Sequence, residues 1–213
     1  MPCQDALLAA PHLARSLACR IIGSMPHNEK LSNRRPFKRV EEARVIRMLR
    51  ENGAKTVADI GCGIGNTVQR LVEHGFDAIG LTVNPDEIAT SGVGDRLILA
   101  DIQQPLPDTL RQRVPLDAAV SLDCLEHLDN PLAGLRNINA MLRPGGVFIA
   151  YIPPEKWIEC DYHVIVYTPR QMKWLFNLSG FEVQATQGRY RGKGVTYYAV
   201  KAGQGPLQPG TMK

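Results

Sequence analysis

Glycines at alternate positions, Gly61, Gly63 and Gly65, directly follow a short apolar segment that contains Asp59 and Ile60. Glycine allows a turn to adopt positive φ, and it lets a ligand approach the backbone without meeting a Cβ atom. A helix expected after this loop would add free N–H groups at its first turn. A nicotinamide-binding fingerprint has one more residue before its third glycine, so the spacing disfavours a dehydrogenase. The pattern indicates a ligand-binding loop of another kind.

A second group of residues carries side chains that can move protons. Glu126 and His127 are adjacent, and His163 follows further along the chain. Imidazole titrates near neutrality, and a carboxylate in a closed cleft can be shifted toward it, so all three are candidates for a general base. Asp123, Glu126 and His127 could equally gather a divalent metal. The structural alternatives are that Glu126 and His127 fix their loop and that His163 bonds to backbone.

The segments that would position these residues alternate between strand and helix patterns. Strands are expected at 56–60, 77–83, 96–100, 117–122, 147–152, 181–187 and 195–201. Helices are expected at 40–51 and 67–73 and after Asn84, Asn130 and Thr168. This alternation predicts a parallel sheet covered on both faces, with a ligand where the strand order reverses. The last two strands are too close in sequence for a helical crossover, so they should form a hairpin.

The helix that begins after Thr168 is expected to turn Met172, Leu175 and Phe176 inward, and we also expect Trp174 in the core. The fold class that follows is α/β: a Rossmann-like, doubly wound, seven-stranded and mostly parallel sheet with an antiparallel C-terminal hairpin.

Composition restricts the class of protein. Hydrophobic residues make up 44% of the chain and charged residues 22%, which is ordinary for a globular protein. The net charge of +4 is too small to favour a nucleic-acid partner. Five cysteines without a CxxC spacing indicate reduced thiols and a cytoplasmic protein. Charged residues and Pro11 interrupt the apolar stretch at 6–22, so no membrane span is expected there.

The segment Val57-Ala-Asp-Ile-Gly-Cys-Gly-Ile-Gly65 resembles the first motif of class I S-adenosylmethionine-dependent methyltransferases. The resemblance extends from about residue 43 to residue 201. Asp123-Cys-Leu-Glu-His-Leu128 and Leu142-Arg-Pro-Gly-Gly146 resemble the small-molecule branch, which includes ubiquinone-pathway O-methyltransferases. The chain then divides into an N-terminal helix and basic loop on the substrate side (1–39), a class I methyltransferase domain (40–202) and a flexible tail (203–213).

The resemblance implies that S-adenosyl-L-methionine is the cofactor and that a defined set of residues surrounds it. Gly61 and Gly63 would present their backbone to its methionine part, and the Asp59 carboxylate would favour its ammonium and sulfonium charges. Asp101 would accept from the adenine amino group, with a strand-end cap as its structural alternative. The implied set is Asp59, Ile60, Gly61, Cys62, Gly63, Gly65, Asn66, Leu81, Thr82, Val83, Asp101, Ile102, Leu122 and Asp123.

The end of the second strand departs from the family pattern. Relatives usually carry an acidic residue there that binds both ribose hydroxyls, whereas this chain has Thr82, which resembles the variant of cyclopropane fatty-acid synthases. Either Asn84 or Asp86 is then expected to help, or the affinity for cofactor is modest.

The resemblance implies methyl transfer to an oxygen or nitrogen of a small molecule or sugar. One alternative is an RNA methyltransferase that uses the basic segments 30–39 and 189–193 as phosphate contacts. The basic loop 30–39 could instead be a solvated surface segment, or Arg39 or a neighbour could pair with the methionine carboxylate of the cofactor. Another is a catalytically silent, cofactor-binding partner protein. We expect a monomer or homodimer, and the sequence identifies neither the acceptor nor a need for metal.

Overall fold

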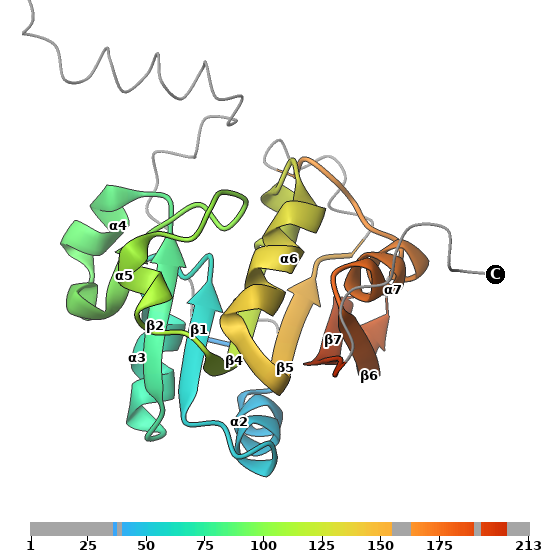
Figure 1. Ribbon diagram of the computed structural model, residues 1–213, viewed down its shortest axis with the longest axis horizontal. Coiled ribbons are helices and arrows are strands. Elements are labelled where there is room, and N and C mark those ends of the chain that lie inside the picture. The colour runs from blue at the N-terminus through green and yellow to red at the C-terminus, as the bar shows by residue number, and fades with distance from the viewer. Residues whose placement is uncertain (1–35, 38–39, 155–162, 190–192, 204–213) are drawn as a thin grey trace, which may run out of the picture. The chain divides into compact units, whose positions relative to one another are not determined.

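Seven strands form one sheet in the order β3-β2-β1-β4-β5-β7-β6 (Figure 1). The strands are β1 (Thr56–Ile60), β2 (Asp77–Thr82), β3 (Leu97–Leu99), β4 (Leu116–Leu122), β5 (Leu142–Ile152), β6 (Phe181–Arg189) and β7 (Gly194–Lys201). β1 to β5 run parallel, whereas β7 is antiparallel to both β5 and β6. The predicted fold class and its C-terminal hairpin are therefore confirmed.

The computed structural model describes residues 36–37, 40–154, 163–189 and 193–203, all within one compact unit, Leu31–Lys213. The predicted N-terminal helix, nearly all of the basic loop and nearly all of the tail lie outside the described residues. Within the described part of the chain, none of the helices has the length and apolar character needed to cross a bilayer.

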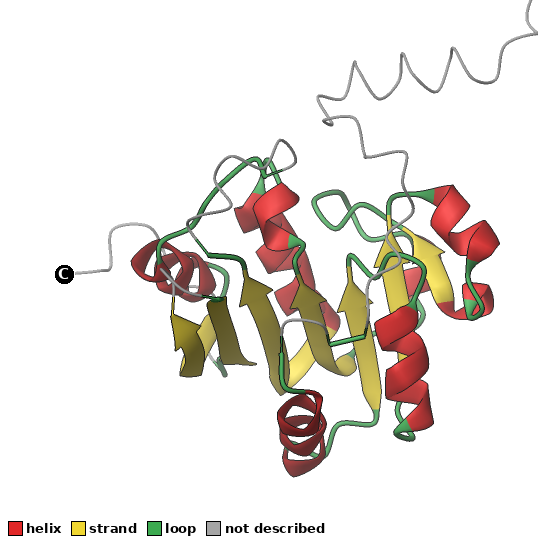
Figure 2. Ribbon diagram, turned by 180° about the vertical axis from the view of Figure 1, so that it is seen from behind, coloured by secondary structure: helices red, strands yellow, loops and turns green. Residues whose placement is uncertain are grey.

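Helices cover both faces of the sheet. One face carries α5 (Asp108–Arg111), α6 (Pro131–Met141) and α7 (Pro169–Leu178), which pack on Ala119 and Phe148 of the sheet. The other face carries α2 (Glu42–Glu51) and α3 (Asn66–Glu73). Figure 1 shows α6 and α7 in front of the sheet. Figure 2 shows the opposite face, with α2 and α3 in front.

Polar caps set where the helices begin, as the sequence predicted. The Asn84 side chain accepts from Asp86 N at the start of α4 (Pro85–Thr90), and Asn130 caps α6 in the same way. At α7, Thr168 forms a capping box with Gln171. Each cap satisfies an N–H group that has no partner inside its helix.

The structure corrects some expected boundaries. β5 begins at Leu142, which pairs with Leu116, so the Pro-Gly-Gly turn lies within a long, irregular strand and not before it. Three helices were not predicted, α5, η1 (Gly94–Arg96) and η2 (Leu125–His127), because they are too short to show a periodic pattern.

The expectation that Trp174 lies in the core is wrong. Met172 and Phe176 of α7 are buried, whereas Trp174 is 49% exposed. A residue two positions from each of them is rotated by about 200° around the helix, which places it on the opposite face.

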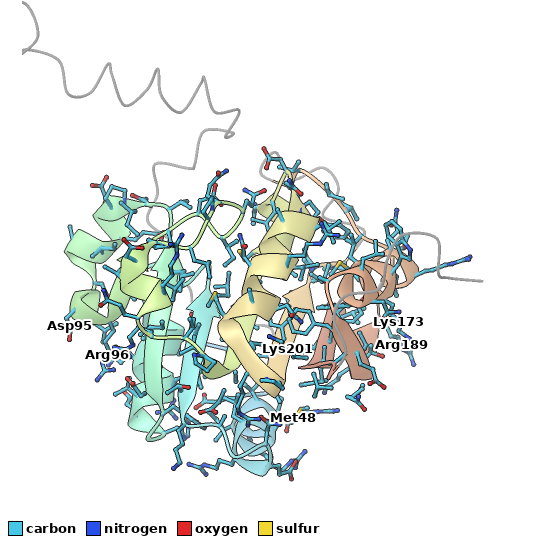
Figure 3. All side chains as sticks on the ribbon, viewed as in Figure 1. Met48, Asp95, Arg96, Lys173, Arg189 and Lys201 are labelled. Atoms are coloured by element: carbon cyan, nitrogen blue, oxygen red, sulfur yellow. The ribbon has the colours of Figure 1, made fainter. Side chains whose placement is uncertain are left out.

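Lys201 of β7 joins the sheet to the end of α6 (Figure 3). Its Nζ donates to the carbonyl oxygens of Asn139 and Leu142 at 2.9 and 2.8 Å. Burial lowers the pKa of Lys201. The ammonium adds hydrogen bonds to two carbonyl groups where α6 ends and β5 begins, and a positive charge is favourable at the C-terminal end of a helix.

Asp117 connects the amino-terminal ends of three strands, β1, β4 and β5, at the end of the sheet opposite the expected site. Its carboxylate accepts from Lys55 N and Thr56 N at 2.8 and 3.0 Å and from Arg143 Nε at 2.8 Å. Burial raises the pKa of Asp117, but these hydrogen bonds outweigh burial and hold it at about 2, below the ordinary 3.8.

We expect Asp117→Asn to lower the free energy of unfolding at pH 7 by roughly 2 kcal/mol, because the charged form makes the stronger hydrogen bonds. The stabilisation from Asp117 is present above its unfolded pKa and is lost as pH falls toward 2. Urea unfolding at pH 7 and pH 3 measures the difference. Equal losses at both pH values would contradict this assignment.

Candidate active site

The glycine loop after β1 is fastened to the end of β2. The N–H groups of Gly61 and Cys62 both donate to the Leu81 carbonyl oxygen at 3.0 Å. Gly65 caps α3 with φ of 84°, and Asn66 is the first residue of that helix. The loop thus passes over the carboxyl ends of β1 and β2, beside the first turn of a helix, where ligands of open parallel sheets bind.

Gly61 allows the loops after β1 and β4 to touch. Its φ of 76° is in the left-handed region. A Cβ atom on Gly61 would lie 2.6 Å from Cys124 Sγ and 2.8 Å from Cys124 Cβ. The strand order reverses between β1 and β4, so these loops line the two sides of the crevice that the topology predicts.

Asp59 is a buried acid at the carboxyl end of β1. It is 3% exposed, and burial raises its pKa to about 7. Removal of a carboxylate from water disfavours its charged form. A ligand with an ammonium or sulfonium group nearby would favour the charged carboxylate of Asp59, so the residue fits the predicted cofactor.

The remaining predicted cofactor residues lie at the ends of the neighbouring strands. Ile60, Leu81, Thr82 and Ile102 are buried, while 42% of Val83 is exposed. Gly63 has a positive φ in the loop, Leu122 is the last residue of β4, and Asp123 follows it. Asp101 Oδ1 accepts from Gln103 N at 2.9 Å, so this residue performs at least the structural role that was its alternative.

The predicted catalytic residues are brought together into one cluster, which we call the His-Glu-His cluster: Glu126, His127 and His163. Glu126 is 1% exposed, and its Oε1 lies 3.8 Å from His127 Nε2 and 3.9 Å from His163 Nε2. The imidazole rings are 5.0 Å apart, edge to face. Sequence reasoning offered the three as separate candidates, whereas the structure makes them neighbours.

Backbone hydrogen bonds explain how residues far apart in sequence meet here. Glu126 lies in η2, directly after β4, and its carbonyl oxygen accepts from Val164 N at 2.9 Å and Ile165 N at 3.2 Å. These bonds hold the residues that directly follow His163 against the chain after β4.

The His-Glu-His cluster could also hold a divalent metal. Its members each offer one ligand atom, and these atoms lie within 4.8 Å of one another. Two imidazoles and a carboxylate suit several transition metals. Asp123, which the sequence had grouped with Glu126 and His127, is not a member of this group.

Three further polar residues lie near the site: Tyr167 and Glu87 were not singled out from the sequence, whereas Ser121 was expected to border cofactor and acceptor. Tyr167 donates to the Leu125 carbonyl oxygen at 3.4 Å, and burial followed by the charge of Glu126 raises its pKa. The buried Ser121 Oγ has no hydrogen-bond partner among the described residues. Glu87 is bonded to Thr82. No motif marks Tyr167 or Glu87, because only the tertiary fold brings them to the site.

A family model described as a methyltransferase domain matches residues 31–186. The chain belongs to this methyltransferase family. The predicted methyltransferase is thereby confirmed at the level of the family. The part of the chain that the family model matches includes the glycine loop, the His-Glu-His cluster and α7.

Known methyltransferases are similar to parts or most of this chain. Sterol 4-C-methyltransferase strm-1 of Caenorhabditis elegans is 32% identical over 44% of this chain and 29% of its own length. Ubiquinone biosynthesis O-methyltransferase of Histophilus somni is 30% identical over 44% of this chain and 42% of its own. The chain thus spans less than half of both curated relatives.

A solved structure matches over a longer span. SAM-bound CalS10, an amino pentose methyltransferase of Micromonospora echinaspora, has a TM-score of 0.60 at 17% identity, covering 94% of this chain and all of its own. At this identity the likeness shows the methyltransferase fold.

We expect Gly61→Ala to destabilise the methyltransferase domain by roughly 2 to 4 kcal/mol, because a Cβ would strain the backbone and displace Cys124. Gly75→Ala is the matched control: Gly75 has φ of 88°, but nothing lies within 4 Å of its added Cβ. The control should lose only about 1 to 2 kcal/mol. Urea unfolding of both variants tests this, and equal losses would show that the Cys124 contact is unimportant.

We expect Asp59→Asn to change how the stability of the cofactor-free protein depends on pH. Because the pKa of Asp59 is raised from 3.8 to about 7 on folding, its contribution to stability is full below pH 4 and is lost as pH rises through 7. Over that range the wild-type protein should lose roughly 2 to 4 kcal/mol of its free energy of unfolding, and Asp59→Asn should not show this loss. Asp117→Asn should act in the opposite direction. Parallel stability curves for wild type and Asp59→Asn would refute the shift.

Proposed function

We propose that this chain is an S-adenosylmethionine-dependent methyltransferase that acts on an oxygen or nitrogen of a small molecule or sugar. The observation that carries the proposal is the His-Glu-His cluster beside a glycine loop, at the point where the strand order reverses. Acceptor hydroxyl and amine groups carry a proton that must leave, and the cluster offers groups that can take it.

Each half of the crevice has its own role. Asp59 and the loop of Gly61 to Gly65 bind and orient the cofactor, which when bound supplies an electrophilic methyl group on a good leaving sulfur. His127 or His163 removes the acceptor proton, and Glu126 stabilises the resulting imidazolium charge. Alignment and exclusion of water supply much of the remaining rate.

The alternatives have less support. An RNA acceptor depends on the basic segments 30–39 and 189–193, and the net charge of +4 is too small to favour a nucleic-acid partner. A catalytically silent partner protein would not need three titratable groups gathered at the acceptor side. The similarity to a sterol C-methyltransferase leaves carbon as a further acceptor atom for the test.

Calorimetric titration with S-adenosylhomocysteine tests the first half of the proposal, and micromolar binding is expected. Release of S-adenosylhomocysteine with phenol, sugar, amino-sugar and sterol acceptors tests the second. Glu126→Gln and His163→Ala should lower turnover on the order of 100-fold, with cofactor affinity within about threefold of wild type.

His74→Ala is the matched control. His74 Nε2 also lies beside a glutamate, 2.7 Å from Glu42 Oε1, but it lies between the end of α3 and the start of β2. Its turnover should stay at the wild-type level. Turnover that survives in both site variants would refute the base assignment. Loss of turnover in EDTA, restored by a divalent cation, would instead favour metal activation by the same residues.

A further inference from the structure

The end of β2 lacks the acidic side chain expected from the family resemblance, but the fold brings a carboxylate to the same place. Thr82 Oγ1 donates a hydrogen bond to Glu87 Oε2, from the first turn of α4. Glu87 is 8% exposed and Thr82 5%. Carboxylates are seldom buried to this extent unless polar groups or a ligand compensate for the lost water.

Thr82 is occupied in holding this carboxylate. Asn84 N donates to Thr82 Oγ1 at 3.1 Å, so the hydroxyl accepts one hydrogen bond and gives its own proton to Glu87. A hydroxyl has a single proton to donate. Thr82 therefore orients Glu87 and does not replace the missing acid itself.

The Glu87 carboxylate lies beside the glycine loop. Burial raises the pKa of the Cys62 thiol, and the charges of Asp59 and Glu87 raise it further. Cys62 Sγ lies against β2, since a Cβ on Gly80 would be only 2.6 Å from it. The carboxylate is thus close to the point where the loop of β1 meets the end of β2.

The neighbours favoured from the sequence are placed differently. Asn84 Oδ1 accepts from Asp86 N at 3.0 Å and so caps α4. Asp86 is exposed to solvent. Of the acidic residues in the described segment 82–90, Glu87 is the one that is buried.

We propose that Glu87 binds the vicinal hydroxyl pair of the cofactor's ribose and that Thr82 is its positioning residue. The inference rests on the proposed function. A carboxylate has about four lone-pair positions, enough to accept from Thr82 and from two ribose hydroxyls. The site would then select nucleosides that carry both hydroxyls, through an acid placed on a helix five residues after the end of the strand.

Calorimetric titration with S-adenosylhomocysteine tests the contact in the full chain. Glu87→Ala should weaken binding by about 30- to 300-fold, because charge-assisted hydrogen bonds are lost, and Glu87→Gln by about 10-fold. Asp86→Ala removes the same charge one residue away, and its affinity should stay within about twofold of wild type.

Analogues of S-adenosylhomocysteine that lack the 2′ or 3′ hydroxyl separate a ribose contact from a general loss of structure. Wild type should bind each of them about 10-fold more weakly, whereas Glu87→Ala should show little further loss because the hydroxyl's partner is already absent. The double variant Thr82→Asp, Glu87→Ala returns a carboxylate to the strand and should regain at least about 10-fold over Glu87→Ala.

Either of two results would overturn the inference: wild-type affinity in folded Glu87→Ala or Glu87→Gln, or an undiminished penalty for the deoxy analogues in Glu87→Ala. Glu87→Gln keeps the side-chain volume and a hydrogen-bond acceptor, so it remains informative if Glu87→Ala does not fold. A wild-type protein that binds no S-adenosylhomocysteine would instead contradict the proposed function.

Discussion

The close contact between Gly61 and Cys124 is the constraint on which the site depends. β1 and β4 are neighbours at the reversal of strand order. The loops that follow them would be pushed apart if Gly61 carried a Cβ atom or if the side chain of Cys124 were larger. One loop presents the backbone of the glycine segment, and the other leads directly into η2 with Glu126 and His127. The absence of a single Cβ thus lets the two halves of the crevice face each other.

Buried carboxylates lie at or near the carboxyl ends of β1, β2 and β4, and their charge favours a cationic ligand. Asp59 of β1, Glu87 of α4 and Glu126 of η2 are all nearly inaccessible to water. Burial of acids costs stability in the empty protein, as the raised pKa of Asp59 indicates. A positively charged sulfonium or ammonium group returns part of that cost. Electrostatic attraction to these buried carboxylates therefore contributes to the binding energy of such a ligand.

The sequence predicted the sheet, the hairpin and the capped helix starts because these depend on local patterns: alternating strands and helices, Asn-Pro and Thr-Pro caps, and glycine stops. It also offered Glu126, His127 and His163 as separate candidates for the catalytic base. It did not predict that His163 joins Glu126, since that depends on hydrogen bonds between the chain after β4 and a segment almost 40 residues later. Nor did it identify Glu87, because a glutamate in the first turn of a helix looks solvated until the fold buries it. Trp174 was placed wrongly because its apolar character outweighed its position on the helix.

The position of β7 has a consequence for how the protein is made. β7 is the last strand in sequence, but it lies between β5 and β6. While the chain emerges from the ribosome, β6 has no neighbour to pair with and the exposed flank of β5 stays open until residues 194–201 have appeared. The half of the sheet that carries the glycine loop can assemble during synthesis, whereas the other half closes only by insertion of its final strand.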